Sequence, residues 1–380
     1  MAIKNSILFY DLSFQTSAIK DIFHSRLSNV LDCNGFIKGN YVHKFENQFS
    51  KYLNVKNVIT VNSGTDALFL AALSLKLNKN DIVFIQTNTY FATVESIARL
   101  NCQIKPCEID LESGQISLKY LEAQLSKIRS INQTQRIIVV VVHLFGNCPD
   151  MDKLVKLSEQ YNFTIIEDAA QSHGSSFDGK SLGSFGLLSS FSFYPAKNLG
   201  AMGDGGAVVT NSDNIGSKVR ALADHGQVEK DLHDSIGINS RLDEIQALVL
   251  SLKIEYLNEW NQQRRHIANI YKQNLQSCAQ VKLLHIHEKC IPNYHLFVIR
   301  ALKRDELIRF LEDEGIQCRI HYPIPMYKQK GFIEYHSEQI DFMETEKFCS
   351  QILSLPMYPG MEERDVIKIS LLIQSFYQNN

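Results

Sequence analysis

Short apolar runs alternate with helical patterns between about residues 58 and 210. Three of these runs are apolar on both faces: residues 81–86 (DIVFIQ), 136–142 (RIIVVVV) and 164–168 (TIIED). Helical spacing follows the first run over residues 91–100 and precedes the third over about 150–161. Continuous apolar strands separated by helices predict a parallel or mixed sheet that is covered on both faces. The pattern therefore indicates an α/β fold.

A long, polar-rich helical pattern over about residues 242–274 follows the strand-forming region. Beyond it, residues 294–300, a helix over 304–314 and residues 316–321 predict a smaller α+β unit. A chain of 380 residues is more than twice the length of a typical domain. We therefore expect a large α/β domain over residues 1–255 and a small C-terminal domain over residues 256–380.

Composition and charge exclude several classes of protein. The 39 basic and 41 acidic side chains give a net charge of -2, without the basic excess of a nucleic-acid binder. No apolar run approaches the about 20 residues of a membrane helix, and no signal sequence is recognised at the start. The eight cysteines include no Cys-x-x-Cys pair, so we expect reduced thiols and no metal site. These features predict a cytoplasmic protein with no membrane or nucleic-acid partner.

A turn of small residues follows the strand at residues 58–61 and leads directly into a helix. Free N–H groups and the positive end of the helix dipole make such a turn an anion site. Gly64 allows close approach of the backbone, and the hydroxyls of Ser63 and Thr65 add possible hydrogen bonds. The alternative is a simple helix N-cap, which Ser and Thr also favour.

Asp168 ends a strand that is otherwise rich in isoleucine. A carboxylate at this place holds a cation or a protonated ring nitrogen, or it caps the next turn. Gln171 follows three residues later and is expected to reach the same ligand. For His173, packing is the favoured interpretation over a direct role.

The glycine-rich loop over residues 194–206 carries one lysine, Lys197. It is not a P-loop, because Lys197 stands between Ala and Asn, and it lacks the Gly-x-Gly-x-x-Gly spacing of a dinucleotide site. A lysine held among apolar neighbours loses its proton readily and becomes a nucleophile. A phosphate site, a carboxylate for a ring nitrogen and such a lysine together indicate a pyridoxal phosphate site.

The chain resembles the DegT/StrS family of pyridoxal-phosphate-dependent aminotransferases, which act on keto-sugar nucleotides. The resemblance extends from residues 35–39 (GFIKG) to 355–357 (LPM), and its motifs are 63–67 (SGTDA), 88–93 (NTYFAT), 142–146 (VHLFG), 167–174 (EDAAQSHG), 191–200 (FSFYPAKNLG), 239–244 (NSRLDE) and 320–323 (IHYP). It implies fold type I, with a large domain built on a mixed seven-stranded sheet and a smaller α+β C-terminal domain. It also implies a homodimer with active sites at the subunit interface.

The resemblance assigns the cofactor contacts position by position. Lys197 would form the covalent link to the cofactor and later move a proton. Asp168 would pair with the pyridinium nitrogen, Gln171 would lie near the ring oxygen, and Tyr90 would stack on the open face of the ring. The contacts to the cofactor phosphate would be Gly64, Thr65, Ser192 and, from the second subunit, Asn239.

The same resemblance suggests the substrate contacts. Arg241 is the expected cation for the donor carboxylate or the nucleotide diphosphate. Tyr194, His321 and Tyr322 are candidates for hexose contacts, with His225 and His143 behind them. Packing is the alternative role for these aromatic and histidine side chains.

Related dehydratases carry His in place of the linking lysine, so Lys197 favours amino transfer. The motifs look most like those of enzymes that act at C3 of dTDP-linked 3-keto-6-deoxyhexoses with L-glutamate as donor. The product would be a deoxyaminosugar for O-antigen or another surface glycan. The alternatives are a 4-keto sugar on a UDP or GDP carrier and a non-catalytic regulatory protein. A nicotinamide dehydrogenase is disfavoured by the missing dinucleotide motif.

Overall fold

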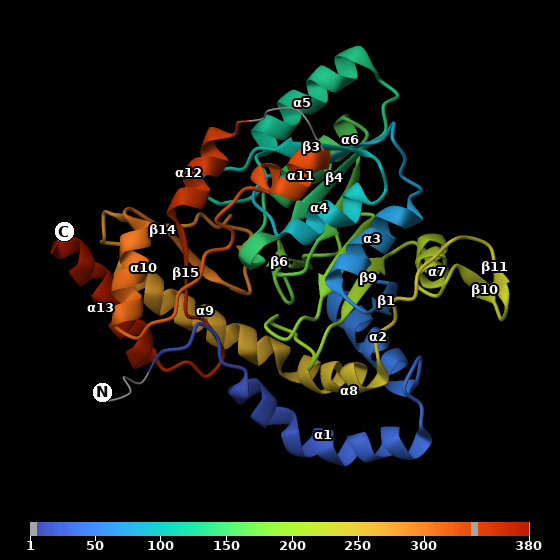
Figure 1. The fold of residues 1–380 in the computed structure, drawn as a ribbon, viewed down its shortest axis with the longest axis horizontal. Helices are drawn as coiled ribbons and strands as arrows, with labels where there is room; N and C mark the ends of the chain where they lie inside the picture. Colours follow the sequence, from blue (N-terminus) through green and yellow to red (C-terminus); the bar gives the residue numbers. More distant parts are fainter. Residues whose placement is uncertain (1–5, 336–340, 380) are drawn as a thin grey trace.

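The computed structural model describes residues 6–335 and 341–379. Its centre is a seven-stranded sheet in the order β1-β9-β8-β5-β4-β2-β3 (Figure 1). The strands are β1 (Asn57–Val61), β2 (Ile82–Gln86), β3 (Gln103–Cys107), β4 (Ile137–Val142), β5 (Thr164–Asp168), β8 (Leu188–Ser192) and β9 (Gly206–Thr210). Strand β9 runs antiparallel to β1 and β8, and the other neighbours are parallel. The expected mixed sheet is confirmed.

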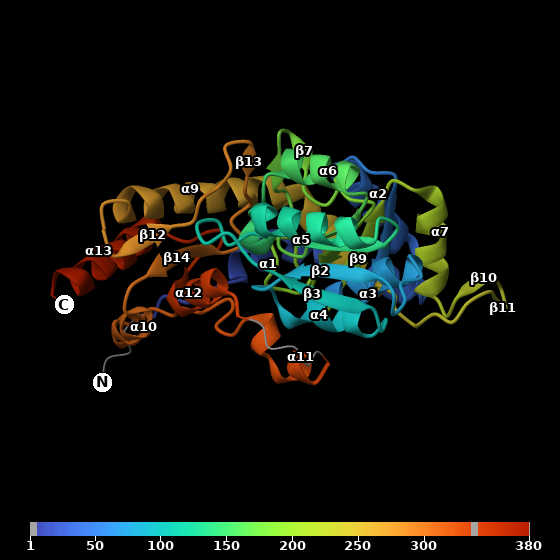
Figure 2. The ribbon, with the colours of Figure 1, turned by 90° about the horizontal axis from the view of Figure 1, so that it is seen from above.

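Both faces of the sheet are covered, which explains why its strands read as continuous apolar runs. In β4, Ile137, Val139 and Val141 pack with helices α5 (Leu118–Ile131) and α6 (Met151–Gln160). The alternate residues Ile138 and Val140 pack with the helices of the opposite face. These opposite helices are α3 (Gly64–Ser74) and α4 (Phe91–Ala98). Figure 2 shows α6 and α4 on the two sides of the sheet.

The region around the seven-stranded sheet contains three more helices, which the hydrophobic pattern of the sequence did not predict. They are α1 (Ser13–Cys33), α2 (Asn40–Leu53) and α7 (Asp213–Leu222). Short strands extend the loops: β6 (Ser176–Phe177), β7 (Lys180–Ser181), β10 (Gln227–Glu229), β11 (Leu232–His233) and β13 (Cys290–Ile291). Strands β10 and β11 form a hairpin that projects from the body of the protein (Figure 1).

The long helical pattern over residues 242–274 is two helices. They are α8 (Glu244–Lys253) and α9 (Leu257–Leu275), separated by a 3₁₀ turn over Ile254–Tyr256. Helix α8 is buried throughout residues 247–253, whereas α9 buries one face. The helical pattern is therefore confirmed, and a 3₁₀ turn divides it into two helices.

A second core lies around the three-stranded antiparallel sheet β12 (Val281–Leu283), β14 (Phe297–Ala301) and β15 (Ile352–Leu355). Around it lie α9 and the helices α10 (Arg304–Asp313), α12 (Met343–Gln351) and α13 (Glu363–Gln378), whereas α11 (Lys330–Tyr335) packs through Phe332 with α4 of the large sheet. Residues 316–321 make two isolated bridges, at Ile316 and Arg319, instead of a strand. Ile7 packs in this core, and the domain boundary near residue 255 stays a prediction.

No helix in residues 6–335 and 341–379 is both long and apolar enough to cross a membrane.

Candidate active site

The turn after β1 packs directly against the end of β8. A Cβ atom on Gly64 would lie 2.5 Å from Cβ of Ser192, so only glycine fits at this position. Ser63 is the N-cap of α3, and its Oγ accepts a hydrogen bond from the Asp66 amide at 3.1 Å. The N-cap is therefore real, and Gly64, Thr65 and Ser192 remain partly exposed beside it. The structure thus brings the predicted phosphate contacts of this chain together.

Asp168 lies at the end of β5 and is 9% exposed. Thr93, which is on α4, donates a hydrogen bond to Asp168 Oδ2 at 2.8 Å, and the Ala170 amide donates to Oδ1 at 3.2 Å. Both donors are neutral, so the carboxylate keeps its charge available for a cationic ligand. The motif of Thr93 was recognised in the sequence, but its contact with Asp168 was not predicted.

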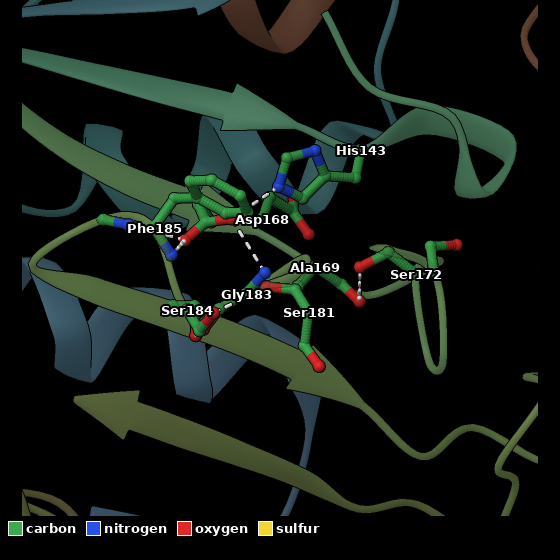
Figure 3. Close-up of polar contacts among 12 residues, drawn as sticks. His143, Asp168, Ala169, Ser172, Ser181, Gly183, Ser184 and Phe185 are labelled. Atoms are coloured by element: carbon green, nitrogen blue, oxygen red, sulfur yellow. Dashed lines mark hydrogen bonds and ion pairs between the residues drawn. The ribbon is translucent and has the colours of Figure 1, made fainter. Parts of the chain in front are cut away.

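Glu167, the neighbour of Asp168, points into the opposite side of the strand and is fully buried. His143 Nε2 lies 2.7 Å from its carboxylate, and the amides of Gly183, Phe185 and Gly186 donate to it at 2.7 Å each (Figure 3). Burial raises the pKa of Glu167, but these bonds outweigh it and hold the pKa below its ordinary value. The network anchors the strand end that presents Asp168. The sequence analysis did not predict this hydrogen-bond network, although a glutamate within an apolar strand indicates a buried, hydrogen-bonded carboxylate.

Lys197 lies in the loop between β8 and β9, and its amide donates to the carbonyl of Tyr194 at 2.8 Å. Its Nζ has no hydrogen-bond partner among the described residues, and the side chain is partly exposed. Burial lowers the pKa of Lys197 to about 8, although the Asp168 carboxylate opposes this change. At pH 7 about a tenth of the amine is therefore unprotonated, far more than for a lysine with the ordinary pKa, and the unprotonated amine is the nucleophile.

Three histidines interact electrostatically with Lys197: His173 and His295 are buried, and His321 is partly buried. Burial, together with the smaller effect of the Lys197 ammonium, lowers the pKa of His173 to about 3 and that of His321 to about 4. The same two causes hold the pKa of His295 well below its ordinary value. These rings are neutral at pH 7. His173 packs against Phe191 with 5.3 Å between ring centroids, in line with the packing role expected for it.

The predicted ring contacts converge on the same place. Gln171 donates a hydrogen bond from Nε2 to the Tyr322 hydroxyl at 3.3 Å, and the Phe145 amide donates to Gln171 Oε1 at 2.6 Å. The rings of Tyr90 and Tyr322 lie 5.6 Å apart. Burial and the Asp168 carboxylate raise the pKa of Tyr322, so it stays a neutral hydroxyl.

The remaining substrate candidates differ in exposure. Tyr194 is 52% exposed, whereas His321 is mostly buried, stacks on Phe9 and has its Nδ1 2.9 Å from Ser354 Oγ. His225 is exposed. His143 is fully buried with Nε2 at Glu167, which favours the packing role over a hexose contact.

Asn239 and Arg241 lie at the surface before α8. Asn239 is exposed, and Arg241 donates to Asp224 Oδ1 at 3.0 Å. Lys38 also pairs with Asp224. Neither Asn239 nor Arg241 makes a hydrogen bond to the lysine site of its own chain among the described residues, so the structure does not bring them to that site.

Comparison with known proteins identifies the fold and the chemistry. A model of the DegT/DnrJ/EryC1/StrS aminotransferase family matches residues 17–374. The chain belongs to this family. A pleiotropic regulatory protein of Geobacillus stearothermophilus is 36% identical over 97% of this chain and 98% of the relative. A dTDP-3-amino-3,6-dideoxy-alpha-D-galactopyranose transaminase of Aneurinibacillus thermoaerophilus is 35% identical over 96% and 97%.

The crystal structure of S. venezuelae DesV in complex with a ketimine intermediate contains a chain whose sequence is 31% identical to that of the present protein. It covers 98% of both chains with a TM-score of 0.92. The fold is therefore that of the pyridoxal-phosphate-dependent aminotransferases, and the expected fold type and cofactor are confirmed.

The residues present fit the cofactor. The unpartnered Nζ of Lys197 is free to link to an aldehyde, and the partly exposed Gly64, Thr65 and Ser192 at the start of α3 can bind a phosphate. Asp168 adds a carboxylate that no cation of the described chain neutralises within hydrogen-bonding distance. Pyridoxal phosphate supplies a carbonyl that takes up the amino group and a ring that withdraws electrons.

Proposed function

We propose that this aminotransferase moves an amino group from L-glutamate onto C3 of a dTDP-linked 3-keto-6-deoxyhexose. The product would serve a deoxyaminosugar of O-antigen or another surface glycan, and the reaction would take place in the cytoplasm. The observation that carries the catalytic part is the deprotonation-prone Lys197 beside the Asp168 carboxylate. Family membership limits the substrate to the class of nucleotide-linked keto sugars.

The choice of carrier and carbon is supported by names of relatives. The 35% identical relative is named for a 3-amino-3,6-dideoxyhexose on dTDP. Other relatives are a UDP-N-acetyl-3-dehydro-alpha-D-glucosamine 3-aminotransferase at 32% identity and a GDP-perosamine synthase at 33%. These names keep UDP and GDP carriers as the alternatives that an experiment must separate.

Each proposed catalytic residue has a task that its surroundings suit. Asp168 would hold a proton on the ring nitrogen, because its hydrogen-bond partners Thr93 and Ala170 are neutral. Lys197 Nζ would move the proton to and from the substrate carbon. Tyr90 would cover the open face of the cofactor ring, and Gln171 would lie near the ring oxygen. Ser192, with Gly64 and Thr65, would bind the phosphate.

We also propose a homodimer with shared active sites. Tyr90 and Tyr194 are 61% and 52% exposed in the single chain, so the lysine site is open on one side. A second copy that brings Asn239 and Arg241 to this opening would supply a phosphate contact and a cation. Tyr194, His321 and Tyr322 are proposed hexose contacts on the chain that carries Lys197.

Turnover of a panel of dTDP-, UDP- and GDP-linked 3-keto and 4-keto sugars with L-glutamate tests the proposal. We expect formation of 2-oxoglutarate with the dTDP 3-keto sugar to exceed that with every other carrier. Preference for a UDP or GDP sugar, or for a 4-keto sugar, would replace the proposed substrate. If no sugar is turned over by protein that carries the cofactor on Lys197, the chain is a regulatory protein, as the name of one relative suggests.

A further inference from the structure

The residue after Lys197 lies at the centre of a buried cluster of amide side chains. Asn198 Nδ2 donates to Asn261 Oδ1 at 2.8 Å and to the carbonyl of Asn293 at 3.2 Å. Its Oδ1 lies 3.0 Å from Nδ1 of His295. Asn198, Asn261 and Asn293 are at most 1% exposed, and His295 is 9% exposed. We call these four side chains the asparagine cluster.

The orientation of every amide in the asparagine cluster is determined by backbone carbonyls, which only accept hydrogen bonds. Asn261 Nδ2 donates to the carbonyl of His173 at 2.9 Å, so its Oδ1 must face Asn198. Asn293 Nδ2 donates to the carbonyls of Gln171 and His173 at 3.0 Å each. Asn198 Oδ1 then needs a donor, so the neutral ring of His295 carries its proton on Nδ1. A network with each donor matched to an acceptor favours one geometry over others.

The asparagine cluster fits closely against the strand-end segments. A Cβ atom on Gly146 would lie 1.8 Å from Asn293 Oδ1, and one on Gly174 would lie 2.4 Å from Asn261 Nδ2. Both glycines have positive φ angles, 86° and 81°, which other residues rarely adopt. The cluster therefore links the segment after β4, the segment after β5 and the lysine loop to α9 and residues 293–295.

The direction of the Lys197 side chain depends on how the asparagine cluster holds the loop. Because its Nζ makes no hydrogen bond to a described residue, the direction of the side chain follows from the placement of the loop backbone. Asn198 holds the loop one residue after the lysine. Lys253 holds it again three residues later, since its Nζ donates to the carbonyl of Gly200 at 2.8 Å. The backbone of Lys197 is therefore held between its own amide bond to the Tyr194 carbonyl and these two anchors on the residues that follow it.

We propose that Asn198 is a positioning residue for Lys197, and that it acts through Asn261, Asn293 and His295. The asparagine cluster sets the direction from which the lysine amine meets the cofactor carbonyl and the substrate carbon. The inference rests on the proposed role of Lys197 as the linking residue. A misplacement of about 1 Å in a reacting group reduces rates by about a hundredfold.

Rapid mixing of cofactor-free protein with pyridoxal phosphate tests this role. The measured quantity is the rate at which visible absorbance of the linked cofactor appears at pH 9.5, well above the pKa of about 8 of the Lys197 amine in the wild-type chain. We expect Asn198→Ala and Asn261→Ala to reduce this rate between about tenfold and a hundredfold. We also expect kcat to fall similarly, with KM for the nucleotide sugar changed less than twofold.

The matched control is Asn274→Ala, which changes an asparagine of the same helix as Asn261. Among the described residues the Asn274 side chain donates only to the carbonyl of Ile270 in its own helix, so its loss should leave the linking rate unchanged. Asn261→Ala lies outside the lysine loop and serves as the second variant if Asn198→Ala does not fold.

Linking rates and kcat within twofold of wild type in a folded Asn198 or Asn261 variant would overturn the proposal, even if the melting temperature falls. If Asn261→Ala also fails to fold, the asparagine cluster is structural and the positioning role is rejected. Borohydride reduction of wild-type protein distinguishes failure of this inference from failure of the Lys197 assignment. A label on another lysine would show that the linking residue itself was misassigned.

Discussion

The low pKa of Lys197 predicts that one side chain makes the stability of the cofactor-free protein depend on pH. Burial lowers this pKa from 10.5 to about 8, although Asp168 opposes the change. The unfolded chain, where the ordinary value holds, therefore binds more protons between pH 8 and 10.5. Stability rises with pH wherever the unfolded state binds more protons. Lys197 thus lowers the free energy of unfolding below pH 8, and this effect disappears as the pH approaches 10.5.

The magnitude follows from the two pKa values. At about 1.4 kcal/mol for each pH unit, the change from 10.5 to about 8 corresponds to about 3 kcal/mol. Lys197 remains partly exposed, and water at the open side screens its charge, so this figure is the upper limit. Lys197→Met keeps the length of the side chain and removes the charge. We expect the cofactor-free variant to be more stable than wild type at pH 7 by up to about 3 kcal/mol.

Urea denaturation of both cofactor-free proteins at several values between pH 7 and 10.5 measures this difference, at one fixed protein concentration. The advantage of Lys197→Met should shrink steadily as the pH rises, because the wild-type amine becomes neutral. Other groups titrate in this range in both proteins and cancel in the difference. Lys127→Met, which changes an exposed lysine of α5, is the control and should show no such trend. A difference that stays constant with pH would refute the argument.

Four further outcomes are expected. Borohydride reduction and peptide mass analysis should place the cofactor on Lys197, and a label elsewhere would contradict this. Asp168→Asn should fold and bind cofactor but lose most of the transamination rate, whereas activity within a few-fold of wild type would reduce Asp168 to a turn cap. Glu167→Gln should lower the free energy of unfolding by about 3 kcal/mol, because a buried charge that accepts several hydrogen bonds is lost; an unchanged urea midpoint is the contrary result. Mixing Lys197→Ala chains with chains mutated at both Asn239 and Arg241 should restore up to about a quarter of wild-type activity if sites are shared, and exchange without recovery would rule sharing out.

The sequence by itself determined the central sheet and the parts of the site that lie at strand ends. Strands buried on both faces need apolar residues at every position, so residues 137–142 were recognisable without any partner. The turn at Gly64, the carboxylate of Asp168 and the loop of Lys197 directly follow or end such strands. Parallel strands carry their carboxyl ends to one edge, which made their proximity predictable. The motifs also gave the family, because they combine local residues of fixed spacing.

Tertiary structure alone decided which buried polar groups support these residues. Glu167 meets His143 and the amides after Ser181 only when two loops close on β5. Asn198 meets Asn261, 63 positions away, and His295, 97 positions away, once α9 and residues 293–295 pack on the lysine loop. No periodicity in the sequence records such contacts, since each amide is individually ordinary. Burial makes every unpaired amide costly, and that cost, set by the packed fold, selects the partners around the reactive lysine.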